Sequence, residues 1–353
     1  MFEPIDKECT RDLCDTCELK KTVELLKTRI GRYLSEWDAY KVNHNAYERV
    51  YTAPPAVMNH DGSFKHPASR AFYKLWEICH EVSELNIIVT RERRIKVGYL
   101  AEGPGSFIEA MVEMRRRNFP NAKDIHEGIS LCSKNRTVPH WKLNNYWCEK
   151  NNVKIDHKYG NGDICNDIVR HNFVKEVGKG SCDIVTGDGG FDFSSDFNAQ
   201  EKMMQKLLSN ECELMINLLK NGGTAILKVF DAFDKNTLCV LGCFCECFSR
   251  FQIIKPKTSR PANSERYLIC IDYNPTNESV LKLKEIIDRI NREDPNIKLQ
   301  ESEEEKFISE LNRSYSLKQV SHILHIMDHI DRRDTSICKD LSKEWMEKYN
   351  LHK

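Results

Sequence analysis

Two glycine-rich turns have the spacing that most plainly indicates chemistry in this sequence. The first lies in 99-YLAEGPGSFIEAM-111 and the second closes 183-DIVTGDGGFD-192, each directly after a short apolar run. Glycine lets the backbone approach a ligand closely, and a helix that begins after such a turn offers a partly positive N-terminus. The turn Gly103-Pro104-Gly105 therefore predicts a site for a small ligand with a polar end.

Two alternatives stay open for this first turn. The dinucleotide fingerprint G-x-G-x-x-G is not met, because the run is G-P-G-S-F-I, and a proline between the glycines favours another cofactor. A Gly-Pro turn that binds no ligand is the structural alternative. The turn taken alone does not decide between them.

The elements that must position these turns alternate between helical patterns and short apolar runs. Between residues 65 and 274 the apolar runs are IKVGYLA, DIHEGISL, CDIVTG, GTAILKVF, FQIIK and RYLICIDY. This alternation is typical of an α/β fold in which helices cover a mostly parallel sheet. We therefore expect the domain of residues 65–274 to be α/β, with the two turns at strand ends.

Helical additions are expected on both sides of this domain. Residues 1–64 contain a cysteine-bearing tail and a helix near residues 19–37, which we expect to pack on the main domain. Its apolar residues recur at helical spacing: Val23, Leu25, Leu26, Ile30, Tyr33 and Leu34. Residues 275–353 are charge-rich and contain no strand candidate, so they predict a small helical C-terminal region.

Composition limits the classes of partner. The 353 residues contain 53 Lys plus Arg and 53 Asp plus Glu, so a polyanion would have to bind a local basic patch. No stretch approaches the roughly 20 apolar residues of a membrane span, and the charged N-terminus does not resemble a secretory signal. The 15 cysteines, an odd number, indicate reduced thiols. We expect a globular cytoplasmic protein without a membrane partner.

Four segments in a fixed order carry a family resemblance. They are 69-SRAFYKLWEI-78, 183-DIVTGDGG-190, 222-GGTAILKVF-230 and 259-SRPANSERYLIC-270. In this order the sequence resembles the FtsJ-like ribose 2′-O-methyltransferases, which include eukaryotic and viral mRNA cap enzymes. The resemblance covers about residues 65–274 and implies a Rossmann-like fold with S-adenosylmethionine as cofactor. It also implies a Lys-Asp-Lys-Glu tetrad, which falls here on Lys74, Asp188, Lys228 and Glu265.

The strand pattern places three of these residues independently. Asp188 and Lys228 each fall at the carboxyl end of a predicted parallel strand, the edge where open α/β sheets bind ligands. Glu265 begins the run RYLICIDY and lies at the same edge if that strand runs antiparallel. Two lysines and two carboxylates balance each other, so their burial is tolerable. Four unrelated surface charges are the alternative interpretation.

The resemblance implies methyl transfer to a ribose 2′-hydroxyl, a poor nucleophile beside an activated sulfonium methyl. The enzyme then mainly aligns oxygen, methyl and sulfur and eases the removal of one proton. In one view Lys228 is the base, its pKa lowered from about 10.4 by desolvation and the charge of Lys74, and Asp188 orients it. Lys74 and Glu265 would hold the hydroxyl and Lys228 in register. In the other view Lys228 stays charged and orients the hydroxyl while the proton leaves late.

The cofactor contacts implied by the resemblance are partly altered in this sequence. Gly103 and Gly105 should face the methionine portion, and Asp163 matches the acid that receives the adenine amino group. Tyr99 stands where the family usually has an acid, and Ser130 stands where an acid would bind the cofactor ribose. The expected cofactor contacts are Gly103, Pro104, Gly105, Ser106, Phe107, Ser130, Asp163 and Asp188.

RNA is the implied partner, and its contacts would come from local groups. The candidates for phosphate contacts are two basic clusters, although charged runs at helix ends are more often solvated faces: Arg91, Arg93, Arg94, Arg115, Arg116 and Arg117. Three aromatic residues could stack on single-stranded bases or lie in the core: Trp141, Tyr146 and Trp147.

Cysteines and histidines offer weaker candidates for metal ligands. Three cysteines near the N-terminus lack a clear fourth ligand, with His44 the nearest histidine by sequence: Cys9, Cys14 and Cys17. Four more lie in an apolar segment and predict helix core: Cys239, Cys243, Cys245 and Cys247. Three histidines share a helix face, for which a polar or packed role is favoured over a metal: His322, His325 and His329. We therefore expect no metal in the site.

Three functions remain open at this point. They are 2′-O-methylation of capped mRNA, the same reaction on ribosomal or transfer RNA, and an inactive relative that binds RNA or acts as a scaffold. The intact tetrad argues against the third. The added terminal regions favour the first, because bacterial-type ribosomal members of the family are nearly all catalytic core. The stretch WDAYKVNHNAYERVYT with SRAFYKLWEI also resembles enzymes of large DNA viruses that replicate in the host cytoplasm.

Overall fold

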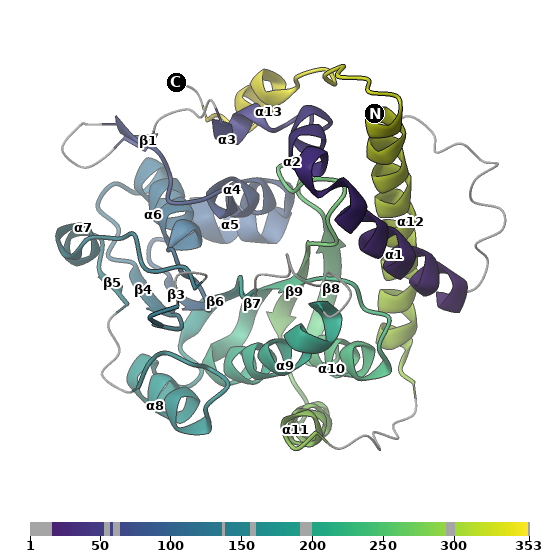
Figure 1. Ribbon diagram of the computed structural model, residues 1–353. Helices are drawn as coiled ribbons and strands as arrows, with labels where there is room; N and C mark the ends of the chain where they lie inside the picture. The colour runs from purple at the N-terminus through teal and green to yellow at the C-terminus, as the bar shows by residue number, and fades with distance from the viewer. Residues whose placement is uncertain are drawn as a thin grey trace.

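A sheet of seven strands occupies the centre of the molecule (Figure 1). The computed structural model describes residues 16–52, 57–58, 64–135, 138–155, 160–190, 200–293 and 301–351. Within these residues the strand order is β5-β4-β3-β6-β7-β9-β8. The strands are β3 (Lys96–Leu100), β4 (Ile125–Ile129), β5 (Val153–Lys154), β6 (Cys182–Gly187), β7 (Leu219–Val229), β8 (Phe248–Ile254) and β9 (Arg266–Tyr273).

The sheet is mostly parallel, as the sequence predicted. Strands β5, β4, β3, β6 and β7 pair in parallel, whereas β9 pairs antiparallel with both β7 and β8. All six predicted apolar runs form strands, and RYLICIDY is the antiparallel one. These strands are almost continuously apolar because helices cover both of their faces. Strand β5 was not predicted, since two residues are too short to show a pattern.

Helices form a layer on each face of the sheet (Figure 1). One layer consists of α4 (Ala71–Glu81), α5 (Ser83–Arg91) and α6 (Ser106–Asn118). The other consists of α8 (Asp167–Val177), α9 (Gln200–Leu218), α10 (Lys235–Cys245) and α11 (Asn277–Asn291), while the short α7 (Asn145–Lys150) lies beside β5. Each layer buries its own apolar cluster against the sheet. The four cysteines predicted as core, Cys239, Cys243, Cys245 and Cys247, are buried in or directly after α10.

The N-terminal extension packs mainly on the C-terminal one. Its elements are α1 (Thr16–Ile30), the 3-10 helix η1 (Gly31–Tyr33), α2 (Leu34–Asn43), α3 (Arg49–Thr52) and the hairpin of β1 (Val57–Met58) and β2 (Phe64–Lys65). The buried face of α1 meets the long helix α12 (Glu303–Asp331), with Leu26 and Ile30 in one cluster with Ile323 and Met327. Our expectation that the extension packs on the main domain is confirmed in part, because Val50 lies in the apolar cluster of the α4–α6 layer and Lys27 pairs with Asp231. Most of the apolar surface that covers α1 comes from α12.

The C-terminal region shares the core of the main domain. Helix α13 (Ser342–Lys348) places Trp345, which is 2% exposed, in the same apolar cluster as Trp76 of α4. The Trp345 indole donates a hydrogen bond of 3.0 Å to Glu77, and the Trp76 indole donates one of 3.0 Å to the carbonyl of Tyr349. Among the described residues beyond 274 the regular elements are all helices, as predicted, but they do not form a separately packed unit. None of the described helices is long and apolar enough to cross a membrane.

Replacement of Trp345 tests whether the C-terminal region is part of the core. We expect Trp345→Ala to lower the free energy of unfolding by about 3–5 kcal/mol, because it leaves a cavity beside α4 and removes one of the hydrogen bonds to the buried Glu77. The control is Tyr146→Ala, since that side chain is 71% exposed and should cost little. Urea unfolding followed by circular dichroism measures both variants. Equal stability of the two variants would contradict the shared core.

Candidate active site

The two glycine turns follow β3 and β6, the neighbouring strands at which the order of strands in the sheet reverses. From β3 the chain continues to β4 on one side, and it later returns to place β6 on the other side. The crevice beyond the carboxyl ends of β3 and β6 is therefore the switch point at which open α/β sheets bind ligands. Gly103 and Gly105 follow β3, and Asp188 follows β6; the Asp188 amide donates a 3.3 Å hydrogen bond to the carbonyl of Leu100.

The first turn requires glycine because another segment of the same chain lies against it. Gly105 has φ of 108°, a left-handed conformation, and a Cβ there would lie 2.7 Å from the side chain of Leu143. A Cβ on Gly103 would lie 2.5 Å from the carbonyl oxygen of Pro139. The segment after β4 therefore packs directly on the turn, and the Ser130 hydroxyl accepts a 2.9 Å hydrogen bond from the Gly103 amide. The turn and this segment form one wall of the site.

The structure buries Ser106 and Phe107, two of the residues expected to contact the cofactor. A carboxylate oxygen of Glu102 accepts hydrogen bonds from the amides of Phe107, at 2.7 Å, and Ile108, at 3.4 Å. The Phe107 side chain is fully buried, with its ring centroid 5.8 Å from that of Tyr267. The Ser106 hydroxyl accepts a 2.9 Å hydrogen bond from Ser69. Both residues are thus engaged inside the protein, because Glu102 rather than a ligand caps the first turn of α6.

The predicted adenine and ribose contacts lie side by side at the same edge. A Cβ on Gly162, next to Asp163, would lie 2.1 Å from the carbonyl oxygen of Ser130, so the two loops touch. Asp163 is half-buried, and its Oδ1 accepts a 2.9 Å hydrogen bond from the Cys165 amide. Tyr99, at the position of the family's usual acid, is buried and hydrogen-bonds His126 at 2.8 Å. Tyr99 is therefore part of the core.

The four tetrad residues form two ion pairs at this edge. Lys74 of α4 pairs with Glu265, which directly precedes β9, at 2.7 Å. Lys228 near the end of β7 lies 3.3 Å from an Asp188 carboxylate oxygen and donates a 2.6 Å hydrogen bond to the carbonyl of Asp188. Lys228 is opposite Tyr267 in the β7–β9 register, which brings Glu265 to the same edge. The predicted convergence through an antiparallel β9 is confirmed.

The pKa of Lys228 differs from the first of the two expectations that we derived for it. Burial lowers the pKa of Lys228, but the carboxylates of Asp188, Glu265 and Glu211 outweigh it, and the pKa is raised above its ordinary value. Burial raises the pKa of Glu265, but Lys74 and Lys228 outweigh it and lower the pKa to about 2. The expected depression of the Lys228 pKa is therefore absent. The arrangement favours the alternative view, in which Lys228 stays charged.

Three further residues of the site escaped the sequence analysis. Glu211 of α9 is buried, accepts a 3.2 Å hydrogen bond from the Gly189 amide, and has its pKa raised by burial to about 8. The Tyr267 hydroxyl donates a 2.9 Å hydrogen bond to Asp188. Lys255 donates a 3.0 Å hydrogen bond to the Glu265 carbonyl, and burial lowers its pKa to about 7. Glu211 had a readable signal, since it falls on the apolar face of its helix.

The predicted arginine contacts to RNA are not at this edge. Arg115 is 2% exposed, and its guanidinium donates hydrogen bonds of 2.7 and 2.9 Å to Asp124 and further ones to backbone carbonyls. Arg116 and Arg117 both pair with Glu113. Three others, Arg91, Arg93 and Arg94, are exposed, but they precede β3 and so lie at the amino edge of the sheet, away from the tetrad. None of these arginines is placed to hold RNA over the tetrad.

The aromatic candidates differ among themselves. Trp141 and Trp147 are half-buried and pack against the core of the α4–α6 layer. Tyr146 is 71% exposed on α7, so of the three only it presents its ring to solvent.

The chain matches a known family over this part of its length. The family model of FtsJ-like methyltransferases matches residues 67–273. The chain belongs to the FtsJ-like methyltransferase family. It is 40% identical over 113 residues to a cap-specific mRNA (nucleoside-2′-O-)-methyltransferase of Autographa californica nuclear polyhedrosis virus, covering 31% of this chain and 43% of that protein. It is 28% identical over 215 residues to zebrafish cap-specific mRNA (nucleoside-2′-O-)-methyltransferase 2, covering 58% of this chain and 28% of that protein.

These similarities are partial. The chain spans less than half the length of both relatives, at 43% and 28%. A solved structure of a putative ribosomal RNA methyltransferase from Plasmodium falciparum aligns with a TM-score of 0.43 at 20% identity, covering 59% of this chain and 99% of that one.

S-adenosylmethionine is the cofactor of this family, and the residues present fit it. Asp163 offers a carboxylate suited to the adenine amino group, and the adjacent Ser130 offers a hydroxyl. In the Gly103–Gly105 turn, the two glycines carry no side chain that would hold a cofactor away from the backbone. Asp188 supplies a negative charge for a cationic sulfonium. The methionine portion would therefore lie beside the turn after β3, and the adenosine beside the loop that carries Asp163.

Replacement of Gly105 tests this placement of the cofactor. We expect S-adenosylhomocysteine, and not NAD, to raise the melting temperature of the wild-type protein by mass action. Gly105→Arg should abolish that shift, because any side chain there must displace Leu143 and strain the turn. Gly31→Arg is the control, since nothing lies within 4 Å of a Cβ at that position. Circular dichroism confirms that the variants fold, and Gly105→Ala serves if the arginine variant does not. An unchanged shift in a folded Gly105 variant would remove the turn from the cofactor site.

Proposed function

We propose that this protein is an S-adenosylmethionine-dependent RNA ribose 2′-O-methyltransferase that acts on a cap-proximal nucleotide of mRNA. The observation that carries the proposal is the pair of lysine–carboxylate ion pairs at the carboxyl edge of the sheet, beside the glycine turn. Membership of the FtsJ-like methyltransferase family and the printed activities of the viral and zebrafish relatives support it.

The site is suited to aligning and polarising a ribose hydroxyl. S-adenosylmethionine supplies an activated methyl group, so the carbon–oxygen bond forms as the carbon–sulfur bond breaks. Lys74 and Lys228 would both direct N–H groups at the 2′-oxygen and stabilise the negative charge that develops on it. Glu265 and Asp188 hold the two ammonium groups at 2.7 and 3.3 Å, so little reorganisation is needed when the substrate binds.

The charge state of Lys228 indicates where the proton of the ribose hydroxyl goes. The raised pKa of Lys228 means that its ammonium group is already protonated and cannot accept the hydroxyl proton. Lys228 would therefore donate a hydrogen bond to the oxygen, and the hydroxyl proton would leave to solvent late, as the carbon–oxygen bond completes. This is the charged-lysine view of the two derived from the sequence.

An end of the RNA is a better substrate for this surface than a long internal site. The tetrad would contact only a ribose, which every nucleotide has. Contacts elsewhere must therefore select which nucleotide is methylated. An internal site in ribosomal or transfer RNA favours a long basic track. The formal net charge is zero, and the arginine clusters of the described residues are either paired internally or at the opposite edge. A compact cap that stacks on aromatic groups needs no such track.

The other candidates are less well supported. An inactive RNA-binding or scaffolding relative would have no need of four converged tetrad residues. Methylation of ribosomal or transfer RNA uses the same chemistry and remains the alternative, which the substrate comparison below distinguishes. For location we propose the cytoplasm, and the host cytoplasm if the chain is viral; reduced thiols such as those of Cys212 and Cys239 support this.

Removal of the tetrad lysine tests the chemistry. We expect Lys228→Ala to reduce methyl transfer by at least ~10²-fold while S-adenosylhomocysteine binding changes little. Asp188→Ala should behave similarly, because it frees the lysine from its position. Lys220→Ala is the matched control, since Lys220 is an exposed lysine at the other end of the same strand. Single-turnover transfer of a labelled methyl group measures the effect, and near wild-type rates in Lys228→Ala would refute the mechanism.

A comparison of RNA ends tests the substrate. One short RNA is supplied with a 7-methylguanosine cap, an unmethylated cap or a 5′-triphosphate, and 2′-O-methylated nucleosides are measured by mass spectrometry. We expect transfer to the first or second transcribed nucleotide of capped RNA, with Lys228→Ala as the blank. Equal transfer to all three RNAs, or transfer only to structured ribosomal or transfer RNA, would support the alternative substrate instead.

A further inference from the structure

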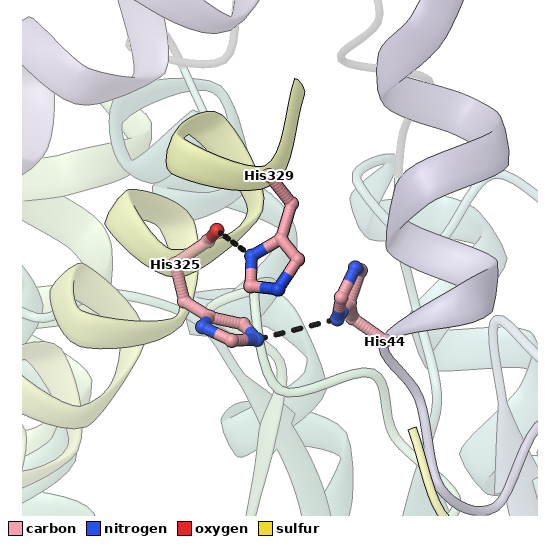
Figure 2. A group of neighbouring side chains, drawn as sticks. All are labelled: His44, His325 and His329. Atoms are coloured by element: carbon pink, nitrogen blue, oxygen red, sulfur yellow. Dashed lines mark hydrogen bonds between the residues drawn. The ribbon is translucent and has the colours of Figure 1, made fainter. Parts of the chain in front are cut away.

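Three histidines gather where the N-terminal and C-terminal extensions meet. His44 lies at the C-terminal end of α2, and His325 and His329 project from one face of α12, with the rings directed toward one another (Figure 2). One ring nitrogen from each histidine lies within 4.8 Å of the others. His44 Nδ1 and His325 Nε2 are 3.2 Å apart. The cluster is separate from the tetrad and plays no part in the proposed methyl transfer.

The spacing of these nitrogens is close to that of a tetrahedral metal site. Zinc binds imidazole nitrogens at about 2.0–2.1 Å, so two ligands of a tetrahedron lie about 3.3 Å apart. The 3.2 Å separation of the His44 and His325 nitrogens matches that value. The remaining separations are at most 4.8 Å, which rotation of the partly exposed imidazoles can shorten. Histidines four residues apart on a helix, as His325 and His329 are, are a common way to bind zinc.

Two of the ring nitrogens, His44 Nδ1 and His325 Nε2, hydrogen-bond each other at 3.2 Å, so an ion bound between them would replace that bond. His329 Nδ1 lies 2.8 Å from the carbonyl oxygen of His325, which directs its Nε2 lone pair away from the helix. A metal-bound histidine typically donates its other N–H to such a carbonyl. His44 Nε2 is buried without a hydrogen-bond partner, an unfavourable state for a polar atom.

An acidic residue is positioned to complete the site. The Asp334 carboxylate lies 3.5 Å from His329 Nε2, and its backbone amide donates a 2.9 Å hydrogen bond to the His329 carbonyl. The aspartate side chain is 46% exposed and so can move toward a bound ion. With three neutral imidazoles, a divalent ion would keep one net positive charge if Asp334 is the fourth ligand and two if water is, so the carboxylate favours binding.

We propose that His44, His325 and His329 bind one divalent transition-metal ion, zinc in the first place, with Asp334 or water as fourth ligand. Imidazole ligands suit zinc among the divalent metals. The sequence analysis favoured a packed or polar face for the α12 histidines. It did not find the cluster, since His44 is 281 residues away from His325 and only the fold brings them together.

The ion would clamp α2 to α12. Helix α12 also supports the active edge: Asn312 accepts a 2.7 Å hydrogen bond from Arg266, and Gln319 donates one of 3.2 Å to the carbonyl of Ala262. These two contacts flank Glu265 along the chain. The clamp would therefore stabilise the helix that carries part of the site, without touching substrate or cofactor.

Zinc binding to untagged full-length protein tests the proposal. The N-terminal cysteines are first replaced, as Cys9→Ser, Cys14→Ser and Cys17→Ser together, so that they cannot supply a second site; Cys9 and Cys14 lie outside the described residues. After chelator treatment, we expect about one equivalent of Zn²⁺ to bind and raise the melting temperature. Co²⁺ in its place should give the visible absorption of a four-coordinate site.

Variants assign the ligands. His325→Gln, His329→Gln and His44→Gln should each weaken Zn²⁺ binding by at least ~10-fold. His322→Gln is the matched control on the same helix, since His322 lies outside the cluster, and it should bind normally. The thermal shift with S-adenosylhomocysteine, which does not depend on the metal, confirms that each variant folds. Zinc binding only while Cys9, Cys14 and Cys17 are present, or equal binding by His325→Gln and His322→Gln, would overturn the proposal.

Discussion

The balance of charge around the buried Lys228 is the constraint on which the site depends. An ammonium group in the interior is tolerated only where carboxylates compensate it, and loss of one partner leaves the other uncompensated at a cost of about 3–5 kcal/mol. Lys228 has Asp188 beside it, and Glu265 interacts with both Lys228 and Lys74. Because Glu265 is shared, the two ion pairs cannot be varied independently, and four residues from four segments must be retained together.

Two further buried carboxyls leave that balance intact because burial disfavours their charged form. Burial is the largest cause that raises the pKa of Glu102 well above its ordinary value, and burial raises that of Glu211 to about 8. Each accepts a hydrogen bond from a glycine turn or the helix after it, Glu102 from Phe107 and Glu211 from Gly189. They hold the two turns in place, and their burial disfavours a further negative charge beside the two ion pairs.

Local sequence patterns were sufficient to predict the strands and the residues at their ends. They were insufficient to predict pKa shifts and ion pairs, which depend on residues that only folding brings together. The six apolar runs and the edge shared by Asp188, Lys228 and Glu265 follow from periodicity and topology, and the structure has them. The view in which the pKa of Lys228 is lowered was wrong, because Asp188, Glu265 and Glu211 together outweigh burial. Neither interpretation offered for Arg115, a solvated face or a phosphate contact, is what the fold shows, because the sequence pattern does not reveal its buried partner Asp124.

The position of Glu265 depends on both terminal extensions as well as on the catalytic core. The next residue, Arg266, is 2% exposed and pairs with Asp231 at 3.2 Å, and its guanidinium also donates to Asn312 of α12. Asp231 in turn pairs with Lys27 of α1 at 2.6 Å. A single buried network thus joins α1, the end of β7, the start of β9 and α12. Since an arginine buried without these partners would be strongly unfavourable, the extensions fix the backbone that carries the tetrad glutamate.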